Sequence, residues 1–227
     1  YSEPTEAQYT QINFVDMPNA VQSEISVQNL VDLKMKDDDY LAALLANRIL
    51  GGGAQARLFL NLREDKGYTY GARGGFGRYR ETGYFAVGAS VKTDTTLASL
   101  IEIKRELQGV GGDKPLSVEE FNEAKKGLLL GYPNRFETIS SVARELSALI
   151  ESGKRPDELE TWSKSVGSVA QKNSQEIAKS LASIRQYVIV VAGDRARVEE
   201  SLKSLGVPIV YCGRDGRPVG NTAETTK

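Results

Sequence analysis

Histidine is absent from the 227-residue sequence, and cysteine occurs once, as Cys212. A structural zinc site needs about four His, Cys or carboxylate ligands, and a catalytic zinc site needs about three. Without histidine, neither a Ser-His-Asp triad nor a Cys-His pair can be assembled. A single cysteine also excludes a disulfide within the chain. Most metallohydrolase and triad chemistry is therefore excluded for this polypeptide alone, and we expect it to bind no metal or other cofactor.

An excess of charge and a long apolar run are also lacking. The 29 Lys and Arg residues balance 30 Asp and Glu residues, so no net charge points to nucleic acid or an anionic membrane as a partner. The longest apolar run, YVIVVA at 187–192, is far shorter than the ~20 residues of a membrane span. We therefore expect neither a nucleic-acid partner nor a membrane span. Because Tyr1 opens the chain without Met or a signal sequence, we expect a piece of a longer protein, whose compartment stays open.

Hydrophobic periodicity predicts the order of helices and strands along the chain. Residues 1–21 contain Pro4 and Pro18 and show no steady period, so we expect a linker or irregular arm there. Alternation and β-branched or aromatic composition predict strands at 22–30, 68–79, 83–91, 186–194 and 208–212. Spacing of apolar residues and capping residues predict helices at 38–50, 54–66, 93–107, 118–131, 134–153, 157–166, 173–184 and 195–205.

This order of elements predicts a layered α+β fold. The strands at 68–79 and 83–91 are separated only by residues 80–82, so they can pair only as a hairpin, which favours a mostly antiparallel sheet. The strand at 186–194 is continuously apolar, which is typical of a strand buried on both faces. We expect residues 22–212 to form a single domain with helices layered on the sheet. Residues 213–227 are expected to be a mobile tail.

Three consecutive glycines, Gly51, Gly52 and Gly53, follow an apolar helix. A phosphate-binding loop needs a strand before the glycines and Lys-Ser or Lys-Thr after them. Here a helix precedes them, and Ala54, Gln55 and Ala56 follow. The pattern indicates a helix end and a tight turn between two helices, because glycine is favoured just past helix ends.

Two acidic clusters and one basic run have ordinary structural interpretations. Asp37, Asp38 and Asp39 precede an apolar helix and are typical of a cap that complements the helix dipole. Glu119, Glu120 and Glu123 fit a capping box with Ser117 and a solvated helix face. The basic run consists of Arg63, Lys66, Arg73, Arg78 and Arg80, interleaved with Tyr68, Tyr70, Phe76 and Tyr79. Aromatic rings among arginines can form a stacking surface for single-stranded nucleic acid. The same alternation also fits ordinary packing of side chains across paired strands.

Arg63 and Tyr70 form the more specific pair, because a turn at Gly67 can bring both to one surface. An Arg guanidinium and a phenol can donate hydrogen bonds to a peptide carbonyl or to a developing oxyanion. The alternative is that Arg63 pairs with a local carboxylate and Tyr70 packs. The residues alone leave both interpretations open.

The sequence resembles the zinc metallopeptidase family of pitrilysin, insulin-degrading enzyme and mitochondrial processing peptidase. The segment NRILGGGAQARLFLNLREDKGYTYGA (47–72) is similar to the signature of that family's second half. SEISV (23–27), SVEEFNEAKKGLLLGYPNRFET (117–138) and IVVAGD (189–194) fall where the family has a strand, a later helix and a closing strand. The resemblance covers nearly the whole chain.

This resemblance implies a fold and a set of partners. Peptidases of the family are built from two similar halves that close around an unfolded peptide, and each half has a mostly antiparallel sheet flanked by helices. The first half carries an inverted zinc motif, His-x-x-Glu-His. The second half lacks the metal ligands and supplies an Arg and a Tyr, seven residues apart, which correspond to Arg63 and Tyr70. The missing histidine then fits a metal-free C-terminal half.

The function expected from the sequence is that of a non-catalytic half of a zinc-dependent endopeptidase. Zinc would be held by an N-terminal half, in the same chain or in a separate subunit. Arg63 and Tyr70 would bind the substrate peptide, and Gly51–Gly53 would be a structural turn that positions the helix bearing Arg63. The alternative is a catalytically inert scaffold or peptide-binding subunit with the same fold.

Overall fold

The computed structural model describes residues 10–31, 33, 39–78, 83–183 and 186–219. The strands are β1 (Gln11–Asp16), β2 (Gln22–Val31), β3 (Thr69–Arg78), β4 (Gly83–Lys92), β5 (Val188–Gly193) and β6 (Ile209–Cys212). The α-helices are α1 (Tyr40–Leu50), α2 (Arg57–Phe59), α3 (Thr96–Gly109), α4 (Val118–Gly131), α5 (Ile139–Glu151), α6 (Glu158–Ser168), α7 (Gln171–Ser183) and α8 (Arg195–Lys203). A π-helix, η1 (Leu60–Asp65), follows α2, and two 3₁₀ turns are η2 (Thr93–Thr95) and η3 (Pro133–Phe136).

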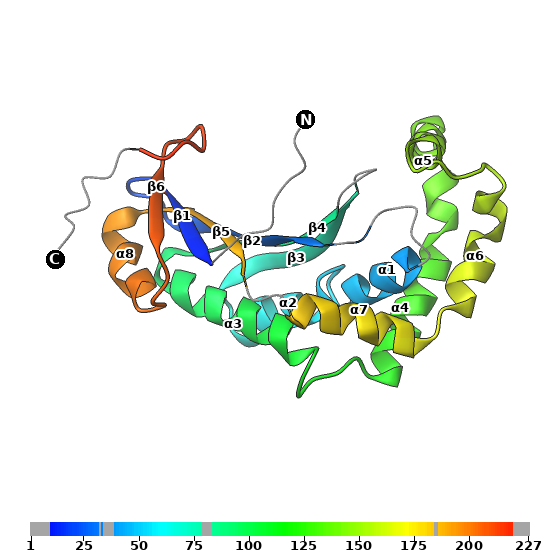
Figure 1. Ribbon diagram of the computed structural model, residues 1–227, viewed down its shortest axis with the longest axis horizontal. Helices are drawn as coiled ribbons and strands as arrows, with labels where there is room; N and C mark the ends of the chain where they lie inside the picture. Colours follow the sequence, from blue (N-terminus) through cyan, green and yellow to red (C-terminus); the bar gives the residue numbers. More distant parts are fainter. Residues whose placement is uncertain (1–9, 32, 34–38, 79–82, 184–185, 220–227) are drawn as a thin grey trace.

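One six-stranded sheet organises the molecule, with the strand order β3-β4-β2-β5-β1-β6. The first four strands of this order pair antiparallel, whereas β1 pairs parallel with both β5 and β6. Figure 1 shows α1, α3, α4 and α7 layered on one face of the sheet, with α5 and α6 at the end of the molecule away from α8. The prediction of an α+β fold with a mostly antiparallel sheet is confirmed.

The core fills the space between the sheet and the helix layer. On β4 every second residue is buried, and Phe85, Val87 and Val91 are among them. This alternation is that of a strand with one face against helices. The buried residues of α1 recur at helical spacing and include Leu45 and Ile49. Within the described residues, no helix is both long and apolar enough to cross a membrane.

An irregular arm was expected over residues 1–21, but strand β1 lies within this range. Gln11–Asp16 lies in the sheet between β5 and β6, and the side chains of Ile12 and Phe14 are fully buried. The prediction is wrong here because six residues between turns give little periodicity. In addition, the partners of a parallel strand lie far along the chain, so no adjacent turn marks the pairing. Residues 1–9 lie outside the described part of the chain.

Several other boundaries differ from the predicted ones. The helix expected over 54–66 starts at Arg57 and changes to a π-helix at Leu60. The helix expected over 134–153 is divided into η3 and α5. Strand β5, expected to be buried on both faces, buries only Val191 and Gly193 fully, because helices cover one face of the sheet.

The C-terminal residues 213–227 and the residues that precede α1 are only partly described. Residues 213–219 fold back along β6, and Val219 N donates to Tyr211 O at 2.9 Å; residues 220–227 of the expected mobile tail lie outside the described residues. The expected helix caps Asp37 and Asp38 also lie outside them, and Asp39 precedes α1 without a side-chain cap.

Candidate functional site

The turn between α1 and α2 runs closely against β3. Gly51 N donates to Asn47 O at 2.8 Å, and Gly51 O accepts from Gly74 N on β3 at 3.1 Å. A Cβ on Gly51 would lie 2.5 Å from the Cα of Gly74, so this approach of two backbones requires glycine. A Cβ on Gly52 would press on the backbone of α1, whereas Gly53 faces open space. The glycines join two helices, which is not the strand-to-helix context of a phosphate-binding loop.

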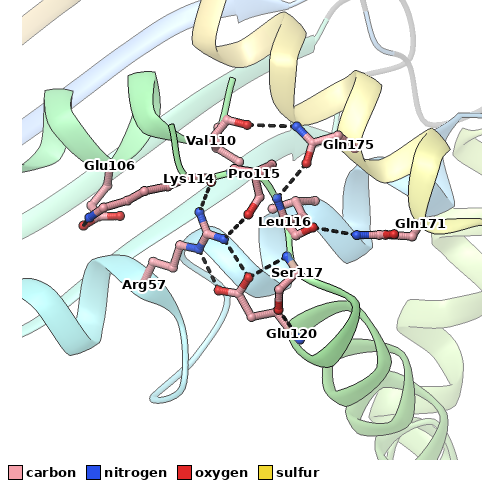
Figure 2. Close-up of polar contacts among 10 residues, drawn as sticks. All are labelled: Arg57, Glu106, Val110, Lys114, Pro115, Leu116, Ser117, Glu120, Gln171 and Gln175. Atoms are coloured by element: carbon pink, nitrogen blue, oxygen red, sulfur yellow. Dashed lines mark hydrogen bonds and ion pairs between the residues drawn. The ribbon is translucent and has the colours of Figure 1, made fainter. Parts of the chain in front are cut away.

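Arg57, the first residue of α2, ties this helix to the start of α4 (Figure 2). Its Nε and Nη2 donate to the carboxylate of Glu120 at 2.7 and 2.6 Å, and its Nη1 and Nη2 donate to the backbone oxygens of Lys114 and Pro115 at 2.5 and 2.8 Å. Glu120 also closes the predicted capping box with Ser117. Burial raises the pKa of Glu120, but hydrogen bonds from Arg57 and Ser117 outweigh it and hold this pKa below its ordinary value.

The loop that accepts from Arg57 is fixed from its other side by α7, as Figure 2 also shows. Gln175 accepts from Leu116 N at 2.6 Å and donates to Val110 O at 2.9 Å. Gln171 donates to Leu116 O at 2.6 Å. The backbone groups of the loop are therefore satisfied by α2 and α7 together. Arg57 thus anchors α2 to a segment that is itself held in place.

A second anchor lies inside the π-helix. Asn61 Nδ2 donates to Glu102 Oε2 at 2.9 Å and to Glu106 Oε1 at 2.7 Å, both on α3. The neighbouring Leu62 is fully buried in the core. The π-helix is a rare form that occurs frequently at functional sites. Here it carries Arg63, and the contacts on either side fix the backbone from which this side chain projects.

The side chain of Arg63 lies at the surface and has only loose partners. Its exposed fraction is 46%, and its Nε lies 3.4 Å from Glu64 Oε1. The guanidinium lies 4.9 Å from the centre of the Phe59 ring, within the range of a cation–π contact. A surface ion pair of this length contributes little to stability. The guanidinium is therefore oriented by a ring and keeps donors for another group.

Tyr70 projects from a β-bulge. The pairing register between β3 and β4 shifts between Thr69 and Ala72, which leaves Tyr70 and Gly71 outside the ladder. Thr69 Oγ1 accepts from Gly71 N at 3.0 Å and donates to Ser90 O at 2.5 Å, so the bulge is held by a side chain. Tyr70 is 85% exposed, and its hydroxyl has no hydrogen bond to any described residue. A bulge re-aims a side chain in this way.

The structure brings both residues to one surface hollow of about 270 Å³, at the ends of β2, β3 and β4. Its lining consists of Gln22, Arg63, Gly67, Tyr68, Thr69, Tyr70 and Lys92. The sequence interpretation missed Gln22 and Lys92. The hairpin signal could have located Lys92, because hairpin pairing places the end of the second strand beside the start of the first.

A larger hollow, of about 710 Å³, lies elsewhere, between α1 and α4. Its lining carries both signs of charge, with Arg48 and Lys126 as well as Glu119, Glu120 and Glu123, and it also includes several small residues. Volume alone therefore does not mark the site. The smaller hollow has the converging hydrogen-bond donors that polar recognition requires.

The remaining candidate clusters show no metal chemistry in the described part of the chain. No group of three or more His, Cys, Asp or Glu residues among the described residues is placed to bind a metal ion. Glu120 serves Arg57 and the cap of α4 instead. Tyr79 and Arg80, from the run of basic and aromatic residues, lie outside the described residues.

Comparisons with solved structures identify the fold. A peptidase M16 inactive domain from Pseudomonas fluorescens has a TM-score of 0.74 and 22% identity over 85% of this chain and 45% of its own. A protease from Helicobacter pylori gives a TM-score of 0.70 and 16% identity over 82% of this chain and 45% of its own. The chain thus spans less than half of the length of these two.

A third structure matches this chain over nearly all of its own length. The inactive peptidase domain of a candidate zinc protease from Bordetella parapertussis has a TM-score of 0.65 and 18% identity, over 77% of this chain and 94% of its own. No curated protein matches the chain by sequence.

The family model described as the peptidase M16 inactive domain matches residues 3–128, which is more than half of the chain. The matched range contains both Arg63 and Tyr70 and ends within α4. This match confirms the resemblance to the metal-free second half of insulinase-like peptidases. The chain therefore belongs to the family of peptidase M16 inactive domains.

Proposed function

We propose that this chain is the non-catalytic C-terminal half of a zinc-dependent endopeptidase and that Arg63 and Tyr70 bind the substrate peptide. The observation that carries the proposal is their placement at one exposed hollow. Each projects from a local irregularity of the backbone, a π-helix for Arg63 and a β-bulge for Tyr70. Such irregularities are found frequently at functional sites.

The two side chains supply hydrogen-bond donors and a positive charge. The Tyr70 hydroxyl and the Arg63 guanidinium can both donate to the carbonyl oxygen of a peptide bond. Negative charge develops on that oxygen during hydrolysis, so the same contacts strengthen in the transition state. Their orientation beforehand, by Phe59 and by the bulge, avoids reorganisation during the reaction.

Zinc and the general base would come from an N-terminal half, fused to this chain or separate. A zinc ion bound there supplies a Lewis acid and an activated water. The described residues of this chain offer no ligand set for zinc. The membership in a family of inactive peptidase domains supports this division of roles.

The test is made on the assembled two-half peptidase with the variants Arg63→Ala and Tyr70→Phe. We expect each to lower kcat by about 10²–10³-fold, as for the loss of one oxyanion donor. Both side chains are exposed, so the unfolding midpoint should not change. Arg73→Ala is the matched control, since Arg73 is exposed on β3 and does not line the hollow.

Unchanged cleavage by Arg63→Ala and Tyr70→Phe would remove the assigned role. The second candidate, an inert peptide-binding subunit, rests on the same exposed donors, Arg63 and Tyr70, at the hollow. It predicts saturable binding of an unfolded peptide that both variants weaken, with no cleavage in a mixture with any zinc-bearing half.

A further inference from the structure

Lys92 is the second cation at the hollow that holds Arg63 and Tyr70. It is the last residue of β4, directly opposite Gln22 on β2. Its backbone N–H donates to Tyr68 O at 2.9 Å, which fixes the position from which the side chain projects. The side chain is exposed and has no ion pair with any described residue. Lys92 therefore adds to the lining a cation that no carboxylate of the described residues pairs with.

Among the residues that the structure describes, none that lines the hollow carries a carboxylate. The polar residues of this lining include Arg63, Lys92, Tyr70 and Gln22, whose side chains carry a guanidinium, an ammonium, a hydroxyl and an amide group. Two cations and two neutral donors around one small space produce a positive potential that favours an anion. Tyr68 adds an apolar ring, half-buried against the core.

The acidic side chains nearby have partners of their own. The carboxylate of Glu24 accepts from the Ser90 hydroxyl. Asp65 pairs with Lys66 at 2.8 Å, and this contact lowers the pKa of Asp65. Glu64 pairs with Arg63 at 3.4 Å and with no other cation of the described residues.

The next acidic residue along the chain after Lys92 is also engaged. Asp94 pairs with Arg197 on α8 at 2.5 Å. No carboxylate of the described residues is thus directed at Lys92. A charged group that enters the hollow meets Lys92 without displacing an existing ion pair.

We infer that Lys92 makes this hollow a subsite for a carboxylate of the substrate, next to the peptide bond that Arg63 and Tyr70 bind. The inference rests on the proposed function. A hollow of about 270 Å³ holds one or two residues of extended peptide, at about 3.3–3.6 Å per residue. The preferred substrate therefore carries Asp or Glu, or its terminal carboxylate, within about two residues of the scissile bond.

The test compares matched peptides on the assembled two-half peptidase. One pair has Glu or Gln at each position within two residues of the scissile bond, and another pair has a free or amidated C-terminus. We expect kcat/KM to favour the carboxylate-bearing peptide by about two- to fivefold, the range of one exposed charge pair. The preference should decrease at high salt.

Variants of Lys92 test whether this residue causes the preference for a carboxylate. Lys92→Gln should abolish it, and Lys92→Glu should turn it toward peptides with Lys at the same position. Lys104→Gln, an exposed change on α3 outside the hollow, should leave it intact. If the peptide with Glu is preferred over the peptide with Gln, the subsite binds a side-chain carboxylate. If only the peptide with a free C-terminus is preferred over its amidated form, the subsite binds the terminal carboxylate.

The outcomes separate this inference from the proposed function. If Arg63→Ala lowers cleavage while both peptide pairs react equally, the carboxylate subsite is overturned and the proposed function stands. If Arg63→Ala leaves cleavage unchanged, the proposed function fails. The subsite is then tested by the dissociation constants of the same peptides from the chelator-treated assembly, where equal constants overturn it.

Discussion

The turn after α1 shows at the scale of single residues how neighbouring glycines differ in what they require. Gly51→Ala would force a methyl group against the backbone of Gly74, so β3 and the turn must separate. We expect it to lower the free energy of unfolding by about 1–3 kcal/mol, the cost of overpacking. The added methyl group of Gly53→Ala has no atom within 4 Å. This change should raise the free energy of unfolding by up to about 1 kcal/mol, because it reduces the conformational entropy of the unfolded chain. Urea unfolding of the two variants checks this, and equal effects would contradict it.

The same pair of variants tests whether the turn positions Arg63. In the assembled peptidase, Gly51→Ala should lower kcat/KM, because the start of α2 moves with the turn. Gly53→Ala is the matched control and should leave cleavage unchanged. That the glycines serve Arg63 stays a prediction until this comparison is made.

At the scale of elements, Arg57 is the residue that joins α2 to α4. Arg57→Gln removes the bidentate contact and leaves the partly buried carboxylate of Glu120 without its cation. We expect the free energy of unfolding at neutral pH to fall by about 1–3 kcal/mol. Arg155→Gln is the control, because its ion pair with Asp157 is exposed and should contribute less than about 0.5 kcal/mol. Equal losses in the two variants would contradict a special role of Arg57.

This contact also predicts a pH dependence of stability. The pKa of Glu120 lies below its ordinary value of 4.5 in the folded chain, so the folded state binds fewer protons there than the unfolded state. The stabilisation is present above pH 4.5 and is lost as the pH falls through the lower, folded pKa. As the pH falls below 4.5, the free energy of unfolding should therefore decrease less in Arg57→Gln than in the parent chain. Chemical unfolding at a series of pH values measures this, and parallel curves would contradict it.

Local signals predicted most of the elements, and their limits have physical causes. The Ser117–Glu120 capping box is a short-range pattern and lies where the sequence indicates. The π-helix at Arg63 and the bulge at Tyr70 were not predicted, since composition does not distinguish them from an ordinary helix and strand. The contact between Arg57 and Glu120 joins residues far apart in the chain, so no local rule could predict it. The spacing of Arg63 and Tyr70 was visible, but their common hollow was not.

At the scale of the whole molecule, the proposed function makes activity a property of two halves. We expect this chain alone not to cleave a peptide, because its described residues contain no group of three or more His, Cys, Asp or Glu side chains that could hold a zinc ion. A mixture with the zinc-bearing half should cleave, and a chelator should abolish cleavage until zinc is restored. Peptide hydrolysis followed with and without each component checks this. Cleavage by this chain alone would contradict the proposal.

The position of β1 in the sheet has a consequence for biosynthesis. Ile12 pairs with Ile189 on one side and with Ile209 on the other, so an early segment lies between the last two strands. Contacts between segments so distant in sequence slow folding. On a ribosome that adds about 5–20 residues per second, β1 waits about ten seconds or more for its partners. During that time Ile12 and Phe14, which are buried in the folded chain, lie on an unpaired strand, and an unpaired strand is prone to pair with another chain until its own partners are made.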